Sequence, residues 1–413
     1  MVVPRTCRAW LVCTILLIAS IASPLGAAAE TRVQTEIESI AAAWWTGSEL
    51  AVMGTARGTV DFRSAPHQMV QSRLQLRLTL LDIAGAPLTI PEVPRAYVRF
   101  RFPVTDDYTV RFTTGRDRLS WGIGSLFNAG DLLFGSDGRS TADMIATDEV
   151  RDETAWLLAG YFPAGDLGYL ETVLLPGLPG FDLAGLAENM PPVTGNQDST
   201  PADDSSTGPP LPGNLGDGTT ISDIRGGLRL HLTAGSLSIE PAYLYDGRSN
   251  HNRFALSLQG TALDADLYAA AGLDIPVNSP PPASELLRDF SRMSLGIFRS
   301  YTAGYDHTIT SRLEALLLPG GSWEKQPYPH ADYGLLLYPE LTWAPGRTVT
   351  TLARAVVSPL DLSADFTVGA SWNLFQGFTL LGYASLQAGA EDALYHPDRP
   401  QGMAAGAGVR YRF

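Results

Sequence analysis

The sequence predicts an all-β protein whose strands close into a single antiparallel β-barrel of about 16–18 strands. Three observations predict this fold. Polar and apolar residues alternate with a period of two in many segments of the chain. Short and long links between those segments alternate along most of the chain. No apolar run beyond the N-terminal segment approaches the roughly 18 residues that a membrane-spanning helix needs.

The alternation is clearest in the segment 73–80, with the sequence RLQLRLTL. Its four leucines fall on one face of a strand, and Arg73, Gln75, Arg77 and Thr79 fall on the other. Successive side chains of a strand point to opposite faces, so this strand has one dry and one polar side. The same pattern recurs at 96–102, 228–233, 254–259 and 409–413. About 17 strands are found in this way, and a further strand at 36–46 would make 18.

The lengths of the links distinguish a membrane barrel from a soluble sheet. Tight links are predicted at 103–107, 163–166, 234–236, 263–265, 305–308, 344–347 and 373–377. Long links are predicted between them at 83–94, 121–151, 176–220, 274–290, 319–331 and 391–401, with modest ones at 246–250 and 358–363. A transmembrane barrel has short periplasmic turns on one rim and long extracellular loops on the other. A soluble sandwich shares the alternation of polarity but has no reason for this rhythm.

Residues 1–29 are predicted to be a secretory signal peptide and not part of the fold. Arg5 and Arg8 precede the apolar run 11–21, and three alanines lead to a cleavage position near Ala29. The run is shorter than the roughly 20 residues of a spanning helix. Residues 30–413 are therefore expected to form one barrel domain.

Composition limits the chemistry of the barrel. Both cysteines lie in the predicted signal peptide, so the mature chain is expected to have no disulfide, thiolate metal ligand or cysteine nucleophile. Without the two arginines of that peptide, 27 basic residues face 43 acidic ones, a formal charge of −16 that argues against nucleic acid as a partner. Hydrophobic residues make up 45% and charged residues 17%, which suits a soluble two-domain protein or a barrel in lipid.

Arginines on the polar face of three consecutive predicted strands are the main candidates for a functional site. They are Arg73, Arg77, Arg99, Arg101 and Arg111. In a barrel this face lines the lumen, and pores that select anions use rings of Arg or Lys. The alternative interpretation is structural, because the interior of a barrel is polar and these arginines could pair with carboxylates such as Asp61 or Glu153.

The segment 114–128, TGRDRLSWGIGSLFN, ends the third of these strands. A Gly-Arg strand that runs into Trp-Gly and a loop with an Asn resembles a segment of outer-membrane porin-like and capsule-assembly barrels. The resemblance covers about 15 residues and implies the barrel class without fixing a substrate. The alternation slips near Gly115, which predicts a bulge or an inward bend. Such a bend would place Arg116 and Arg118 at a constriction of the lumen.

The C-terminus resembles the sorting signature of bacterial outer-membrane β-barrels. That signature is an aromatic last residue with an aromatic or apolar residue two positions before it, here Phe413 and Tyr411. The resemblance implies localisation in the cell outer membrane, contact with its lipid, and recognition of the last strand by the barrel-assembly machinery. Porins of this size are often trimers, so a homo-oligomer is a further expectation.

The long link at 176–220 is predicted to be an acidic extracellular loop. It contains eight Pro, eight Gly and six acidic residues, and no Lys or Arg. A segment of this composition buries too little apolar surface to fold alone. The same loop could instead fold inward and narrow the lumen.

The expected function is a porin-like passive channel for small polar or anionic solutes, with no catalysis, cofactor or metal. At 16–18 strands the lumen holds water unless a loop plugs it. One alternative is a non-channel surface barrel, an adhesin or a polysaccharide-assembly factor, that acts through its extracellular loops. Another is an outer-membrane hydrolase using His330 and Asp332. Against it, no serine lies in a nucleophile elbow and no histidine pair has metal-site spacing.

Overall fold

The computed structural model describes residues 31–46, 49–65, 69–83, 86–139, 150–151, 153–176, 224–304, 306–327, 332–399 and 402–413. These residues contain 18 β-strands and one short helix, α3 (Ala283–Asp289). The predicted signal peptide and almost all of the predicted loop at 176–220 lie outside the described residues. No helix in the described ranges is long and apolar enough to cross a membrane.

The strands follow one another along the chain with only α3 between them. Their bounds are β1 (Arg32–Thr46), β2 (Glu49–Arg63), β3 (Val70–Ile83), β4 (Ala86–Pro103), β5 (Thr109–Asp117), β6 (Ala155–Pro163), β7 (Gly168–Leu175), β8 (Arg225–Ala234), β9 (Leu237–Asp246), β10 (His251–Ala262), β11 (Ala265–Pro276), β12 (Ser291–Ala303), β13 (His307–Leu317), β14 (Leu335–Ala344), β15 (Val349–Ser358), β16 (Ser363–Phe375), β17 (Phe378–Ala388) and β18 (Met403–Arg412).

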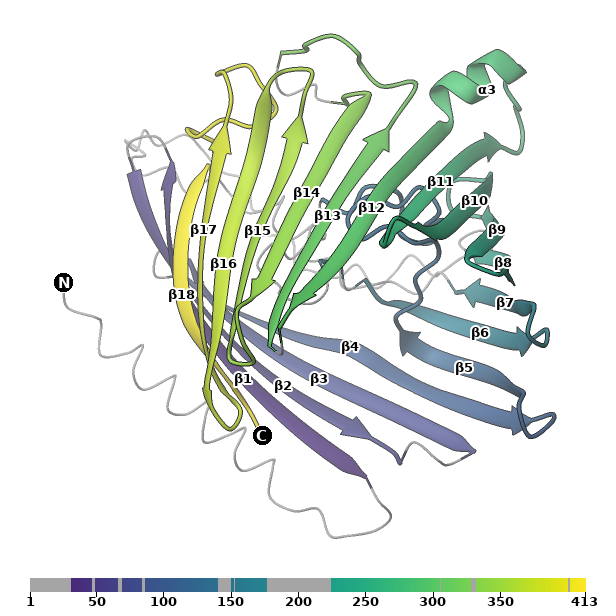
Figure 1. Ribbon diagram of the computed structural model, residues 1–413, viewed down its shortest axis with the longest axis horizontal. Helices are drawn as coiled ribbons and strands as arrows, with labels where there is room; N and C mark the ends of the chain where they lie inside the picture. Colours follow the sequence, from purple (N-terminus) through teal and green to yellow (C-terminus); the bar gives the residue numbers. More distant parts are fainter. Residues whose placement is uncertain are drawn as a thin grey trace, which may run out of the picture.

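The strands form one sheet that closes on itself (Figure 1). Each strand pairs antiparallel with its neighbours in sequence, and β1 also pairs with β18, from Glu36 opposite Arg412 to Trp45 opposite Met403. Closure leaves no sheet edge with unpaired backbone groups. The predicted closed all-β barrel is thereby confirmed with 18 strands, and the segment 36–46 does supply a strand, β1.

The two rims of the barrel differ in the length of their links. At the short rim the links are 64–69, 104–108, 164–167, 235–236, 263–264, 304–306, 345–348 and 376–377. At the long rim the longest links are 118–154, 176–224, 277–290, 318–334 and 389–402. The predicted rhythm of short and long links is thus present for most of the chain.

The predicted long link at 83–94 is wrong. Strands β3 and β4 continue to Ile83 and Ala86, which pair with each other. Proline lacks the N–H that a sheet ladder uses, yet Pro91 and Pro87 pair in register with Leu78 and Asp82. Pro94 lies at the shift of register between Gln75 and Arg77.

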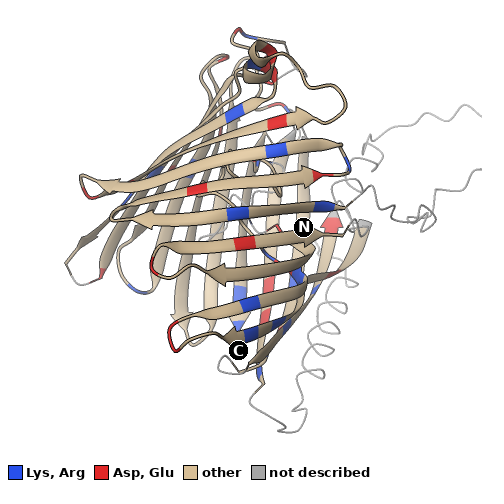
Figure 2. Cartoon of the chain, turned by 90° about the vertical axis from the view of Figure 1, so that its right-hand side faces the viewer, with Lys and Arg blue, Asp and Glu red and all other residues tan. Residues whose placement is uncertain are grey.

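Large apolar side chains cover the outside of the barrel. Leu74 and Leu76 of β3 are 41% and 43% exposed, whereas the side chain of Arg73, on the opposite face of the same strand, is 14% exposed. Other exposed apolar side chains on outward positions are Phe100, Leu158, Leu228, Leu256, Leu295, Leu313, Phe366 and Leu386. Charged residues occur along the strands as well as in the links (Figure 2), and the pairing places those of the strands mainly on the inward face.

Candidate functional site: the lumen

The link between β5 and β6, residues 118–154, turns into the barrel and is called the inward loop below. Within its described part, Trp121, Leu126 and Phe127 are 0% exposed. The N–H of Ala129 donates to Ser294 Oγ on β12 (2.9 Å). Ser294 lies on the inward face of the wall, so this contact places the loop inside the lumen and not above the rim.

Glu314 on β13 is the main anchor of the inward loop. Its fully buried carboxylate accepts the N–H groups of Ser125 (2.7 Å), Leu126 (2.9 Å) and Phe127 (2.8 Å). The Tyr268 hydroxyl on β11 donates to the same carboxylate. Successive backbone N–H groups directed at one point form a concave anion site. Here the anion is part of the barrel wall, so a single side chain fixes the backbone of the loop.

Two more carboxylates hold the start of the loop. Glu240 on β9 accepts the N–H of Gly122 (2.7 Å), and Glu171 on β7 accepts the indole N–H of Trp121 (3.0 Å). Arg229 on β8 lies between them and donates to Glu171 (2.8 Å) and Glu240 (3.2 Å). Each buried carboxylate therefore has both a loop donor and a positive charge, which is the condition for burying it without a large loss of stability.

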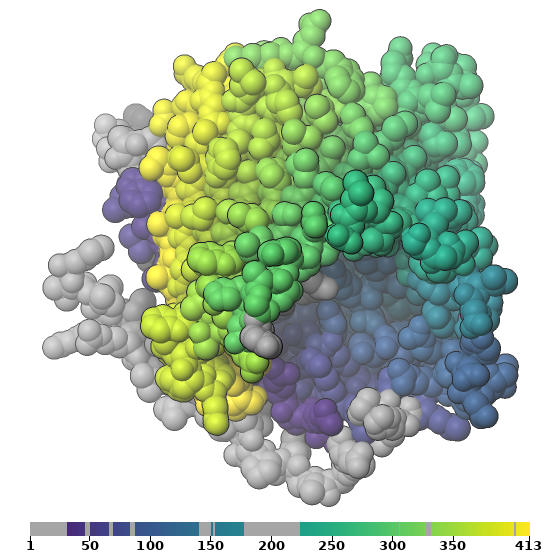
Figure 3. All heavy atoms as spheres, in the orientation of Figure 1, coloured from purple at the N-terminus to yellow at the C-terminus, as the bar shows by residue number. Residues whose placement is uncertain are grey.

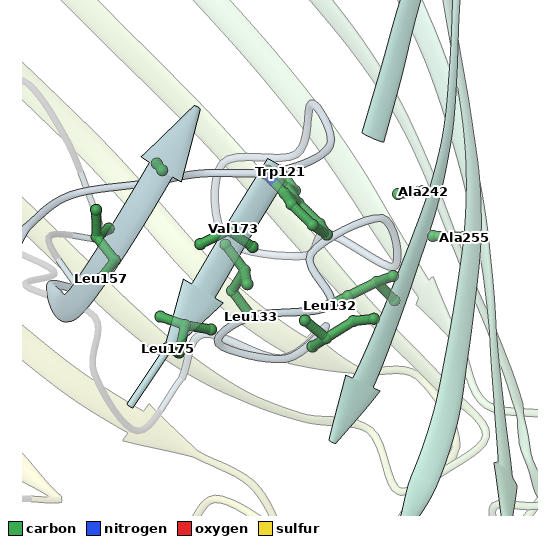
Figure 4. Close-up of a cluster of buried hydrophobic side chains, with 10 residues drawn as sticks. Trp121, Leu132, Leu133, Leu157, Val173, Leu175, Ala242 and Ala255 are labelled. Carbon is green, nitrogen blue, oxygen red and sulfur yellow. The ribbon is translucent and has the colours of Figure 1, made fainter. Parts of the chain in front are cut away.

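Apolar packing holds the same side of the loop against the wall (Figure 4). Trp121, Leu132 and Leu133 of the loop pack against Val173 and Leu175, which are inward residues of β7. A second cluster joins Leu126, Phe127 and Val150 of the loop to inward residues of β13–β15, namely Leu316, Leu336, Tyr338 and Val356. These apolar residues face the interior of the barrel, yet they are shielded from water by the loop.

The wall formed by β2–β5 carries a surplus of positive charge and is called the basic wall. Its described inward side chains include eight arginines and three carboxylates. The arginines are Arg57, Arg63, Arg73, Arg77, Arg95, Arg99, Arg101 and Arg111, and the carboxylates are Asp61, Glu92 and Asp117. The space-filling view is hollowed, and atoms of the first strands, in purple and blue, form the floor of the hollow (Figure 3).

Two of the predicted arginines pair with carboxylates at the centre of the basic wall. Arg73 donates to Asp61 through Nε (2.9 Å) and Nη2 (2.6 Å), so one predicted carboxylate partner is where the structural interpretation expects it. Arg77 lies 3.8 Å from Glu92. The carboxylate of Glu153, the other partner predicted from the sequence, binds Arg151 of the inward loop (2.8 Å).

Of the other predicted arginines, Arg99 lies near the start of the inward loop, and Arg101 and Arg111 lie near the short rim. Arg99 donates to Thr113 (3.1 Å) and to Asp117 (3.1 Å). Arg101 and Arg111 face each other across β4 and β5, and the Arg111 guanidinium lies 3.8 Å from the ring centroid of Tyr161. All three belong to inward rows of the sheet.

Arg116 and Arg118 do not lie together. Gly115 has a φ of +118°, but the pairing of β5 continues past it without a shift. Arg116 pairs with Trp156, lies on the outer face, and donates to Thr154 (3.0 Å). Arg118 follows the end of β5 and lines an open pocket of about 510 Å³ with Arg95, Tyr97, Arg99, Asp117 and Ser120. The structure therefore places Arg118, but not Arg116, beside the lumen.

The carboxylates that anchor the inward loop were missed from the sequence. Glu171, Glu240 and Glu314 follow the polar parity of their strands and look like ordinary lumen residues. A sequence signal for a packed loop was nevertheless present at Leu316, two positions after Glu314 on β13. Leu316 has the same parity as Glu314 and is 0% exposed, although an inward position of a water-filled barrel should be polar. Apolar residues on the polar face indicate that something packs on that wall.

Asp131 of the inward loop gives the packing of the loop a pH dependence. Burial raises the pKa of Asp131 to about 6, although the Arg151 guanidinium 3.4 Å away lowers it. The packed loop therefore binds a proton more tightly than a released loop, whose Asp has a pKa near the usual value of about 3.9. The contribution of Asp131 to the packing is largest below about pH 4 and falls by about 3 kcal/mol as the pH rises to about 6, at 1.36 kcal/mol per unit.

We expect hydrogen exchange in residues 125–134, corrected for the intrinsic rate, to show less protection at pH 7 than at pH 4. An Asp131→Asn variant should show little change in protection over this range, because its side chain does not titrate. An equal loss of protection in the variant and in the natural chain would mean that another group is responsible.

The C-terminal residues complete the barrel. The N–H of Phe413 donates to the Thr35 carbonyl (2.9 Å), and the N–H of Thr35 donates to the Phe413 carbonyl (2.8 Å). The rings of Tyr411 and Phe413 have centroids 5.4 Å apart and are 40% and 49% exposed. The two predicted sorting residues thus lie together on the last strand, where it pairs with β1.

The residues proposed for a hydrolase are not brought into a site that the structure describes. His330 lies outside the described residues, and the Asp332 carbonyl accepts the N–H of Ser322 (2.7 Å) within the link 318–334. No group of three His, Cys, Asp or Glu side chains suited to a metal ion is found in the described part of the chain.

No family model and no curated protein matches the chain. Among solved structures, two engineered variants of the porin of Rhodopseudomonas blastica are similar at 12% and 11% identity. Each match covers 92% of this chain and 100% of that porin, with a TM-score of 0.42. The expected likeness to porin-like barrels is confirmed for the fold, and this rests on the closed 18-stranded sheet itself.

Proposed function

We propose that the protein is an outer-membrane channel through which small polar or anionic solutes diffuse passively. The observation that carries the proposal is the division of the lumen into two unlike walls. The inward loop covers inward positions of β7, β9, β12 and β13, whereas the inward face of β2–β5 carries the basic wall. A solute that crosses the lumen would pass along a row of arginines, and such rows favour anions.

The outer surface supports the membrane location. Its apolar side chains include Phe102, Phe112 and Phe162, whose rings form a contiguous group near the short rim with centroids 6.0 Å and 5.6 Å apart. Aromatic rings gather at the level of the lipid headgroups because they are apolar with a polarisable face. We also propose that residues 1–29 direct export, and that the strand ending at Phe413 is recognised by the barrel-assembly machinery.

Charge reversal on the basic wall tests the channel. The purified full chain, reconstituted in planar bilayers under a KCl gradient, should give stepwise currents and a reversal potential that favours chloride. Replacing Arg95 and Arg118 by Glu should lower the chloride-to-potassium permeability ratio about fivefold or more, because both line the same open pocket. Arg288→Glu is the matched control, since Arg288 lies on α3 with a 66% exposed side chain.

A cation preference in the natural chain would contradict the proposed anion selectivity. A folded barrel without any conductance would contradict the channel and favour a surface barrel that acts through its extracellular loops. A shift in Arg288→Glu equal to that of the double variant would show that rim charge, and not the basic wall, determines selectivity.

A further inference from the structure

A pair of facing arginines near the short rim differs in its surroundings from the other such pair of the basic wall. Arg101 and Arg111 lie directly opposite each other on β4 and β5, two pairs from the turn 104–108. Like charges opposite each other destabilise a sheet. Arg63 and Arg73 also face each other, but Asp61 binds both, at 2.6 Å in each case.

Arg111 has no such carboxylate. Among the described residues it forms no salt bridge, and its guanidinium lies 3.8 Å from the ring centroid of Tyr161. The Tyr161 ring in turn lies 4.7 Å from that of Tyr169, which stacks on His231 at 4.9 Å. Three rings from β6, β7 and β8 therefore support one guanidinium by a cation–π contact and keep it in one place.

The pocket at this position has room for an anionic group. It has a volume of about 100 Å³, and its lining includes Arg99, Arg111, Tyr161, Asp117 and Glu171. Its two carboxylates are already engaged, because Asp117 accepts from Arg99 (3.1 Å) and Glu171 accepts from Trp121 (3.0 Å). Glu171 also accepts from Arg229 (2.8 Å). Arg118 also lines the pocket and has a partner of its own, so among the described lining residues the arginine for which no ion pair is found is Arg111.

We propose that Arg111, with Arg101 opposite and Tyr161 behind it, forms a binding site for the carboxylate group of a small solute at the short-rim end of the lumen. A carboxylate accepts two parallel N–H bonds from a guanidinium, and it offsets the repulsion between the two arginines. The proposal deepens the proposed function, on which its role in transport rests. The site lies at the short rim, whereas Glu314 fixes the loop farther along the lumen wall.

The site can be tested by binding of acetate to the full chain in detergent micelles, measured by saturation-transfer NMR. Acetate should give a saturable signal, and methylammonium, a cation of similar size, should give none. Arg111→Gln should raise the half-saturating acetate concentration about tenfold, as expected for the loss of one charge-assisted pair. Arg299→Gln, an identical change at the same rim, should leave it unchanged, because Arg299 pairs with Ser311 on the outer face.

A second variant keeps the charge and removes its support. Tyr161→Leu should raise the half-saturating acetate concentration by a smaller factor than Arg111→Gln does. If Arg111→Gln lacks the heat-modifiable gel mobility of a folded barrel, Tyr161→Leu is the variant that tests the site. Unchanged acetate binding in a folded Arg111→Gln variant, or equal binding of methylammonium, would overturn the site. Because binding needs no flow through the barrel, loss of conductance with acetate binding intact would count against the channel and not against the site.

Discussion

Replacing Glu314 by alanine is expected to release the inward loop from the barrel wall and to raise the single-channel conductance severalfold. The substitution removes the acceptor of three N–H groups, those of the partly buried Ser125 and of the buried Leu126 and Phe127. Each buried donor left without an acceptor costs about 1–3 kcal/mol, so the packed position of the loop loses several kcal/mol. The contacts that remain, at Glu171, Glu240 and Ser294 and in the two apolar clusters, are then opposed by the entropy of a long loop.

Conductance in planar bilayers and hydrogen exchange of residues 125–134 would measure the release. Glu92→Ala is the matched control, because Glu92 lies on the basic wall with a 28% exposed side chain and is 3.8 Å from Arg77. It should change neither conductance nor exchange by much, since exposed pairs contribute about 0–1 kcal/mol. Unchanged conductance in Glu314→Ala, with the loop still protected, would contradict the role of Glu314 as the main anchor and would show that the remaining contacts hold the loop.

Replacing Arg354 by methionine is expected to destabilise the barrel by about 3–5 kcal/mol, because it leaves a buried carboxylate without its main partner. The Arg354 side chain is 2% exposed and donates to Glu340 (2.8 Å). Tyr338 donates to the same carboxylate (2.5 Å), and its ring lies 6.4 Å from that of Phe127. Loss of the pair should therefore also loosen the wall against which the inward loop packs.

The urea concentration at the midpoint of unfolding in lipid vesicles would measure this cost. A double variant, Arg354→Met with Glu340→Leu, should regain most of the lost stability, since replacing both partners by apolar groups leaves no isolated charge. If the double variant is no more stable than Arg354→Met, the cost comes from packing volume and not from the buried charge of Glu340.

The sequence was a good guide to the strands and a poorer guide to the links. Periodic polarity in segments such as 73–80 follows from the pleat of a strand, and the structure has a strand, β3, at this position. The link predicted at 83–94 is instead part of two paired strands, because the pairing of Ile83 with Ala86 and the register shift beside Pro94 are properties of two strands and cannot be read from one. Parity did place Arg73, Arg77, Arg99, Arg101 and Arg111 on inward rows.

The path of the inward loop could not be read in the same way. The inward path was an alternative for 176–220, and the described residues that lie inside the lumen belong to the link 118–154, such as Phe127 and Ala129. Its contacts with the anchoring side chains of the wall join residues 50 to 189 positions apart, such as Trp121 with Glu171 and Ser125 with Glu314. No local pattern encodes such pairs, because they depend on which inward positions meet after the sheet has closed.

The sequence by itself determined that this chain is a barrel. Alternation specifies a wet and a dry face, link lengths specify two unlike rims, and satisfaction of the backbone in an apolar surrounding requires closure. Only the tertiary structure decided which arginines share a pocket, that Arg116 faces outward, and which wall the loop covers. The physical reason is the sequence separation of the residues that determine each feature. Side-chain period is a property of a few consecutive residues, whereas the lumen is made of residues from all around the ring.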